Sequence, residues 1–253
     1  IWSNVLKDSG YCVIQCKSST GKIAGPWHMF TPLFRGDGGH GMLFKKFDIY
    51  PAYDFVSQSF LSSLCTLYKD LPVTMLREHY RCAPTIIGFC NKQFYGGQLI
   101  AMTKECEGPS MKICMTAEGH HARGTKNQRQ ADMIAGEILP ELTKEYSDIG
   151  IIAPYNEQVK VLRSAILAKG FSDIPVDTVH KFQGRENDVI ILSTVDNQIR
   201  SFVDDSHLLN VAVSRAKKLF ILVVSADEQP NSNVKDLINY ISYYNGVVFN
   251  SKI

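Results

Sequence analysis

The sequence predicts an α/β fold in which helices cover both faces of a parallel sheet, preceded by a loop-rich N-terminal segment. From about residue 70 onward, short apolar runs typical of strands alternate with stretches whose apolar residues recur at helical spacing. Residues 1–58 instead carry frequent glycines and no sustained period. We therefore expect a segment of undetermined fold at 1–58 and a domain at 59–253.

The first half of this domain is predicted to contain two strands, each followed by a helix. The apolar run 73–76 predicts a short strand, and the polar residues 77–81 follow it. Pro84 stands where a helix can begin, because proline fits the first helical turn, and apolar residues between 86 and 94 give that helix a face. A second strand is predicted at 111–115, and a helix with apolar residues between 131 and 139 follows a polar loop.

The second half continues the pattern up to the C-terminus. Strands are predicted at 149–153, 176–179, 189–194 and 219–225. Helices are predicted around Val159, Leu162, Ile166 and Leu167, over 208–217, and around 237–241. Such alternation favours a parallel sheet, because each crossover between parallel strands needs a covering element.

Composition excludes some classes of protein and partner. The net charge of +2 gives no global basic field for nucleic acid, and no apolar run approaches the roughly 20 residues of a membrane span. The seven cysteines form no regular framework, which favours a reducing cytoplasmic or nuclear compartment. A zinc site from Cys12, Cys16, His28 and His40 is disfavoured by its spacing, so we expect no metal site. Ile1 replaces an initiator Met, so we expect an internal fragment.

Arg215 is the first candidate for chemistry. It lies in the predicted helix 208–217 beside the small residues Asn210, Ser214 and Ala216, which leave room for a phosphate or a second domain. Arginine can donate two parallel hydrogen bonds to phosphate oxygens. The alternative is a surface arginine at the end of a basic helix.

Residues 177–186 form the second candidate segment, a turn after a strand. Gly184 permits a tight backbone, Gln183 can orient a water or a phosphate, and Glu186 can hold an arginine. The alternative is an ordinary glycine turn with solvated charges, and His180 is equally compatible with a structural role.

Two further segments follow predicted strands. Tyr80 and Arg81 could stack a base and bind a phosphate, or could be a packed tyrosine beside a solvated arginine. The backbone at Pro154 and Tyr155 could meet a nucleic-acid strand, or could simply start a helix.

Taken together, these segments resemble a known family. In their order, 79–81, 152–158, 178–186 and 209–217 look like the second, C-terminal RecA-like lobe of superfamily 1 helicases, with the Upf-type and RecD-like group most similar. The resemblance covers about residues 59–226, and its last two motifs are specific. It implies a RecA-like sheet and ATP with Mg²⁺ bound between two lobes.

The resemblance also implies roles for individual residues. Arg215 would be the arginine finger, Arg81 a second phosphate sensor and Tyr80 an adenine neighbour. Gln183, Gly184 and Glu186 would couple the nucleotide to the strand. The residues expected to face single-stranded DNA or RNA are Thr178, His180, Pro154 and Tyr155.

The sequence departs from the family in its first lobe. It contains no Gly-x-x-x-x-Gly-Lys-Ser/Thr segment: residues 16–23 lack the earlier glycine and the final hydroxyl. No apolar strand ends in an Asp-Glu pair, and the match of residues 36–40 to another family element is treated as chance. We therefore expect ATP and Mg²⁺ to be held mainly by a first lobe that this chain lacks.

The sequence thus predicts the C-terminal motor lobe of a DNA or RNA helicase. The alternative is a non-catalytic module, derived from such a lobe, that binds nucleic acid or a protein. A small-molecule α/β enzyme is disfavoured because no nucleophile–base pattern is present. DNA and RNA remain equally open as substrates.

Overall fold

The computed structural model describes residues 50–53, 59–70, 72, 74–227, 229, 231–244 and 246–251. The chain divides into two compact units, Ile1–Met75 and Leu76–Ile253. The described part of the first unit holds the 3₁₀ helix η3 (Pro51–Tyr53) and the helix α3 (Phe60–Leu67). Ser59 and Ser62 cap the start of α3 reciprocally, which satisfies two backbone N–H groups that a helix leaves free.

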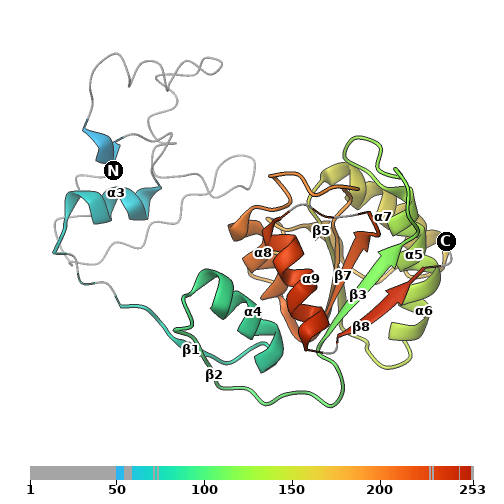
Figure 1. Ribbon diagram of the computed structural model, residues 1–253, viewed down its shortest axis with the longest axis horizontal. Coiled ribbons are helices and arrows are strands. Elements are labelled where there is room, and N and C mark those ends of the chain that lie inside the picture. Colours follow the sequence, from blue (N-terminus) through green and yellow to red (C-terminus); the bar gives the residue numbers. More distant parts are fainter. Residues whose placement is uncertain are drawn as a thin grey trace. The chain divides into compact units, whose positions relative to one another are not determined.

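The second unit is built on a six-stranded sheet in the order β5-β4-β6-β7-β3-β8, shown in Figure 1. All its strand pairs are parallel. The strands are β3 (Met111–Thr116), β4 (Ile149–Ala153), β5 (Val176–Thr178), β6 (Asn187–Ser193), β7 (Ala216–Ser225) and β8 (Val247–Asn250). The predicted α/β class and its parallel sheet are confirmed.

Helices cover both faces of this sheet (Figure 1). One core cluster packs against α4 (Pro84–Phe94), α8 (Ser206–Val213) and α9 (Asn233–Tyr243). The other packs against α5 (Gln128–Met133), the π-helix η4 (Ile134–Ile138), α6 (Leu139–Leu142) and α7 (Asn156–Ala168). Along β6, Ile190 joins the first cluster and Ile191 the second, as expected for a strand buried on both faces.

The predicted strand at 73–76 is wrong. The described residues of this run, 74–76, have no regular secondary structure, and Leu76 is 85% exposed, so the apolar run is not part of the core. The strand in this region is β1 (Glu78–His79), which pairs in parallel with β2 (Ile100–Ala101).

The predicted helix 208–217 is also too long. Helix α8 ends at Val213, Ser214 and Arg215 form a turn, and Ala216 already belongs to β7, where it pairs with Asn187. Ala216 and Lys217 belong to the sheet because the pairing of β7 with β6 begins at Ala216. Leu167, predicted on the apolar face of its helix, is 64% exposed.

Candidate functional site

Two of the motif segments meet at the amino ends of neighbouring strands. Glu186 directly precedes β6 and Arg215 directly precedes β7. The Asn187 amide donates a hydrogen bond of 3.1 Å to the Arg215 carbonyl, which holds the two segments side by side. Ligands of open α/β sheets usually bind beyond the carboxyl ends of the strands. This cluster lies at the other, amino edge of the sheet.

The Arg215 side chain is fixed by its own turn and by the second segment. Its Nε donates to the Val211 carbonyl at 3.2 Å, and its Nη1 donates to the Arg185 carbonyl at 3.4 Å. Its Nη2 lies 3.5 Å from the Ser214 hydroxyl. These acceptors are uncharged, so they orient the guanidinium while leaving its positive charge available to a ligand.

Arg81 joins the same cluster from the loop before α4. Its Nε forms an ion pair with Glu186, and its Nη1 donates to the Ser214 carbonyl at 3.5 Å. The Ala83 amide donates to the Lys217 carbonyl at 2.8 Å, which ties this loop to the start of β7. Three segments that lie far apart in the sequence therefore converge on one place.

The cluster concentrates positive charge. Burial, and after it the charge of Arg81, lowers the pKa of Arg215. Burial, followed by the charges of Arg81 and Arg215, also lowers the pKa of His79, whose Nε2 accepts a 3.0 Å hydrogen bond from the Cys82 amide. Both guanidinium groups are half-buried, and that of Arg81 is ion-paired with the Glu186 carboxylate. An anion such as a phosphate would relieve their repulsion.

The remaining predicted residues of this edge are exposed. Gln183 and Gly184 lie in the turn before β6, and Gly184 has a φ of +87°, a conformation that glycine adopts without steric cost. Tyr80 is 67% exposed, and its hydroxyl donates a hydrogen bond to Glu78. A ligand can therefore reach all three residues.

The predicted nucleic-acid residues lie at the opposite, carboxyl edge. Pro154 and Tyr155 follow β4, and Thr178 ends the adjacent strand β5. Pro154 is buried and Thr178 is 7% exposed, whereas Tyr155 is half-buried and His180 exposed. The burial of Pro154 and Thr178 limits what their side chains can offer to a ligand.

The connection 179–186 joins the two edges. It leaves the carboxyl end of β5 and reaches the amino end of β6, passing the intervening strand β4. Phe182, fully buried, packs so closely on β4 that a Cβ at Gly150 would lie 2.9 Å from its Cε1. Glycine at position 150 therefore gives the crossing the space that it needs.

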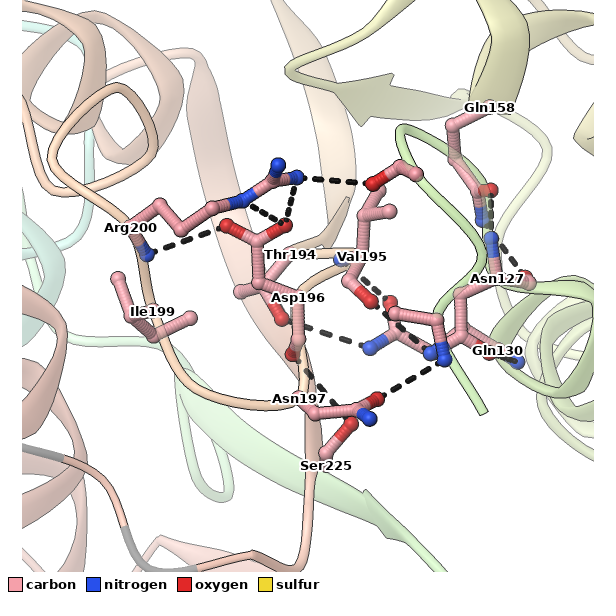
Figure 2. Close-up of polar contacts among 12 residues, drawn as sticks. Asn127, Gln130, Gln158, Thr194, Val195, Asp196, Asn197, Ile199, Arg200 and Ser225 are labelled. Carbon is pink, nitrogen blue, oxygen red and sulfur yellow. Dashed lines mark hydrogen bonds and ion pairs between the residues drawn. The ribbon is translucent and has the colours of Figure 1, made fainter. Parts of the chain in front are cut away.

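The structure also shows a buried polar network at the carboxyl edge, which the sequence analysis missed (Figure 2). The Gln158 amide nitrogen donates to the Asn127 carbonyl at 3.0 Å and to the Ser193 hydroxyl at 3.1 Å. The Asn127 side chain donates to the Val195 carbonyl at 2.9 Å and accepts from the Gln130 amide, capping α5. Gln158, part of the second motif, thus links α7 to α5 and β6.

Val195 has a φ of 72°, in the left-handed region that β-branched residues avoid. Its amide donates to the Gln130 side chain at 2.9 Å and its carbonyl accepts from Asn127, so the network holds this conformation in place. Such a conformation costs about 1–3 kcal/mol and is found mostly at functional sites. The strain lies where the chain leaves β6.

An ion pair and two aromatic rings follow Val195. Arg200 donates through Nε to buried Asp196 at 3.0 Å, and its Nη2 donates to the Gly124 carbonyl at 2.9 Å (Figure 2). The guanidinium carbon of Arg200 lies 5.2 Å from the ring centroid of Tyr155, which stacks on Phe202. The spacing of four between Asp196 and Arg200 was the one sequence signal for this pair.

The described residues show neither a cluster of metal ligands nor a helix fit to span a membrane. The described residues hold no group of three or more His, Cys, Asp or Glu side chains that could bind a metal ion. The zinc combination of Cys12, Cys16, His28 and His40 lies outside them. In the part of the chain that the structure describes, no helix has the length and apolarity to span a bilayer.

A family model described as "AAA domain" matches residues 56–227, more than half of the chain. The chain belongs to this AAA-domain family. The matched range agrees with the range of about 59–226 that the motifs indicate, and together with the helicases below it confirms the resemblance to superfamily 1 helicases.

Relatives of this family member are helicases by name. "Uncharacterized ATP-dependent helicase C05C10.2" of Caenorhabditis elegans is 30% identical over 187 residues, 65% of this chain and 12% of that protein. "Uncharacterized ATP-dependent helicase MJ0104" of Methanocaldococcus jannaschii is 41% identical over 175 residues, 59% of this chain and 26% of that protein. The chain therefore spans 12% and 26% of the lengths of these two relatives.

A solved structure gives a looser overlap. The C-terminal domain of a possible DNA helicase from Lactobacillus plantarum WCFS1 covers 67% of this chain and 98% of its own, with a TM-score of 0.47 and 17% identity.

Proposed function

We propose that residues 59–253 are the C-terminal motor lobe of an ATP-dependent helicase that acts on single-stranded DNA or RNA. The observation that carries the proposal is the convergence of Arg81, Glu186 and Arg215 at the amino ends of β6 and β7. The helicase names of the relatives support it. The free thiols among the described residues fit a reducing intracellular compartment.

Arg215 acts as the arginine finger and Arg81 as the second phosphate contact. The turn acceptors Val211 and Arg185 hold the Arg215 guanidinium in a fixed direction before a nucleotide arrives. A guanidinium oriented in advance stabilises charge on the transferring phosphoryl group without reorganising, and such fingers contribute about 10³- to 10⁵-fold in rate. Glu186 positions Arg81 through their ion pair.

The residues present fit the phosphates of ATP better than its metal ion. Two guanidinium groups suit phosphate oxygens, whereas no metal-binding group is found among the described residues. Tyr80 is exposed enough to lie against an adenine ring. A first RecA-like lobe would be the main partner for ATP and Mg²⁺, since the sequence lacks a phosphate loop.

The connection 179–186 couples nucleotide to nucleic acid. It begins directly after Thr178 and includes His180, and at its end Arg185 and Glu186 contact the arginine cluster. The buried Phe182 anchors its centre on β4. Movement at the arginine cluster can therefore be transmitted to the edge that holds Pro154, Tyr155 and His180.

The test measures the rate of ATP hydrolysis by the full-length protein that contains this chain, with oligo(dT) or oligo(rU) added to stimulate it. Arg215→Ala should lower kcat by about 10³- to 10⁵-fold, and Arg215→Lys should recover little of it because lysine lacks the paired donors. Lys218→Ala removes a nearby cation, which lies in β7 and pairs with Asp188, and serves as the matched control that should leave turnover unchanged.

The outcomes separate the candidates. Unchanged turnover in Arg215→Ala rejects the finger role. Oligonucleotide binding without any ATP hydrolysis by the wild-type protein favours the non-catalytic module instead. The oligonucleotide that stimulates more strongly identifies DNA or RNA as the substrate.

A further inference from the structure

Two aromatic rings lie stacked at the carboxyl edge of the sheet, one in the loop after β4 and one in the loop after β6. The ring centroids of Tyr155 and Phe202 are 5.4 Å apart, with 25° between the ring planes. Tyr155 is half-buried and also has the Arg200 guanidinium against its ring. Phe202 is 46% exposed. The ring of the pair that offers free area is therefore Phe202.

The loop that carries Phe202 is fixed by hydrogen bonds to Asp196. The Asp196 carboxylate, 2% exposed, accepts from both the Nε and the backbone amide of Arg200, at 3.0 Å and 3.2 Å (Figure 2). The Ser225 hydroxyl lies 3.4 Å from the Asp196 carbonyl, which adds the end of β7 to this support. An exposed ring on a fixed loop loses little conformational freedom when a ligand stacks on it.

Positive charge lies on the neighbouring loop. The Ala122 amide donates to Asn197 at 2.9 Å, and the Gly124 carbonyl accepts from Arg200, so the loop after β3 is bound to the one that carries Phe202. Arg123 in this loop donates to the carbonyls of His120 and Ala122, which are neutral acceptors. Its charge remains available for a phosphate backbone.

We propose that Phe202 is a stacking subsite for one unpaired base of the nucleic acid and that Arg200 is its positioning residue. Tyr155 then supports the Phe202 ring instead of stacking on the base itself. The inference rests on the proposed function, because it assumes that nucleic acid crosses the carboxyl edge of the sheet. The chemistry suits single strands, whose bases expose their faces to aromatic side chains whatever the sequence.

The test is equilibrium binding of the 253-residue chain to fluorescein-labelled oligo(dT) and oligo(rU), followed by anisotropy. Phe202→Ala should weaken binding by about 5- to 150-fold, the range that loss of one base–aromatic stack gives, and Phe202→Trp should retain it. Tyr243→Ala, which removes an aromatic ring that is 80% exposed on α9, is the matched control and should bind as the wild type does.

An abasic oligonucleotide distinguishes stacking from a change in the fold. It presents the phosphates without bases, so the wild type and Phe202→Ala should bind it equally. Arg200→Lys should weaken oligo(dT) binding in the wild type and have no further effect in the Phe202→Ala background, because a positioning residue acts through the ring.

Two results would overturn the inference in distinguishable ways. If the wild type and Phe202→Ala bind oligo(dT) and oligo(rU) with equal affinity, Phe202 is not a stacking subsite and the proposed function stands. If the wild type binds neither oligonucleotide, both the subsite and the nucleic-acid part of the proposed function are rejected.

Discussion

Substitution of Gly150 by alanine tests whether the crossing of β4 by residues 179–186 depends on the missing side chain. A Cβ at this position would lie 2.6 Å from Asn187 Oδ1 and 2.9 Å from Phe182 Cε1. Both distances are shorter than the contacts that Cβ atoms make in proteins, and Phe182 is fully buried while Asn187 is 9% exposed. The neighbours must therefore shift for the methyl group to fit.

The expected net cost follows from two opposing terms. Overpacking a well-packed core costs about 1–3 kcal/mol. Replacing glycine also lowers the conformational entropy of the unfolded chain, which stabilises the folded state by about 0.4–1 kcal/mol at a position of ordinary backbone geometry. We expect Gly150→Ala to lower the free energy of unfolding by about 1–2 kcal/mol, and Gly150→Val to lower it further because it adds more volume.

Urea unfolding at equilibrium measures this change, with the m-value checking that the transition keeps its character. Phe182→Leu replaces the ring that the new methyl group meets by a smaller side chain. A double-mutant cycle of the two positions should therefore show a favourable coupling of at least about 0.5 kcal/mol. A neutral or stabilising Gly150→Ala, or a cycle without coupling, would refute the reasoning.

Three further predictions concern the chain as given. The 253-residue chain should show no ATPase stimulated by single-stranded nucleic acid, and turnover of ATP in a phosphate-release assay would contradict this. Asn127→Ala should cost about 2–4 kcal/mol in urea unfolding, because it removes the α5 cap and leaves the Val195 carbonyl without its donor, whereas Asn127→Asp should retain the cap. The pKa of His79 is lowered from 6.5, so the unfolded chain takes up its proton first as the pH falls, and the free energy of unfolding should decline from about pH 6.5 downward. His79→Gln should remove this component of the slope in unfolding curves recorded at several pH values.

The alternation of elements was predictable because it is written in local patterns. Proline at the start of α4 and the apolar run of β4 each carry a signal that depends on a few neighbouring residues. The run at 73–76 has the same local signal and forms no strand in its described residues, since a strand needs a partner and a core to cover it. Edge strand β8 was missed for the converse reason, because its pairing with β3 is a tertiary contact.

The sequence by itself determined the α/β class, the motif segments and the family to which they belong. The tertiary structure alone decided that Arg81, Glu186 and Arg215 converge at the amino edge while Tyr155 and Phe202 stack at the carboxyl edge. The physical reason is that motifs and periodicity are local in the chain. Ion pairs, ring stacking and the space left by Gly150 depend instead on which strands lie side by side, and the order β5-β4-β6-β7-β3-β8 is set by the packing of the whole sheet.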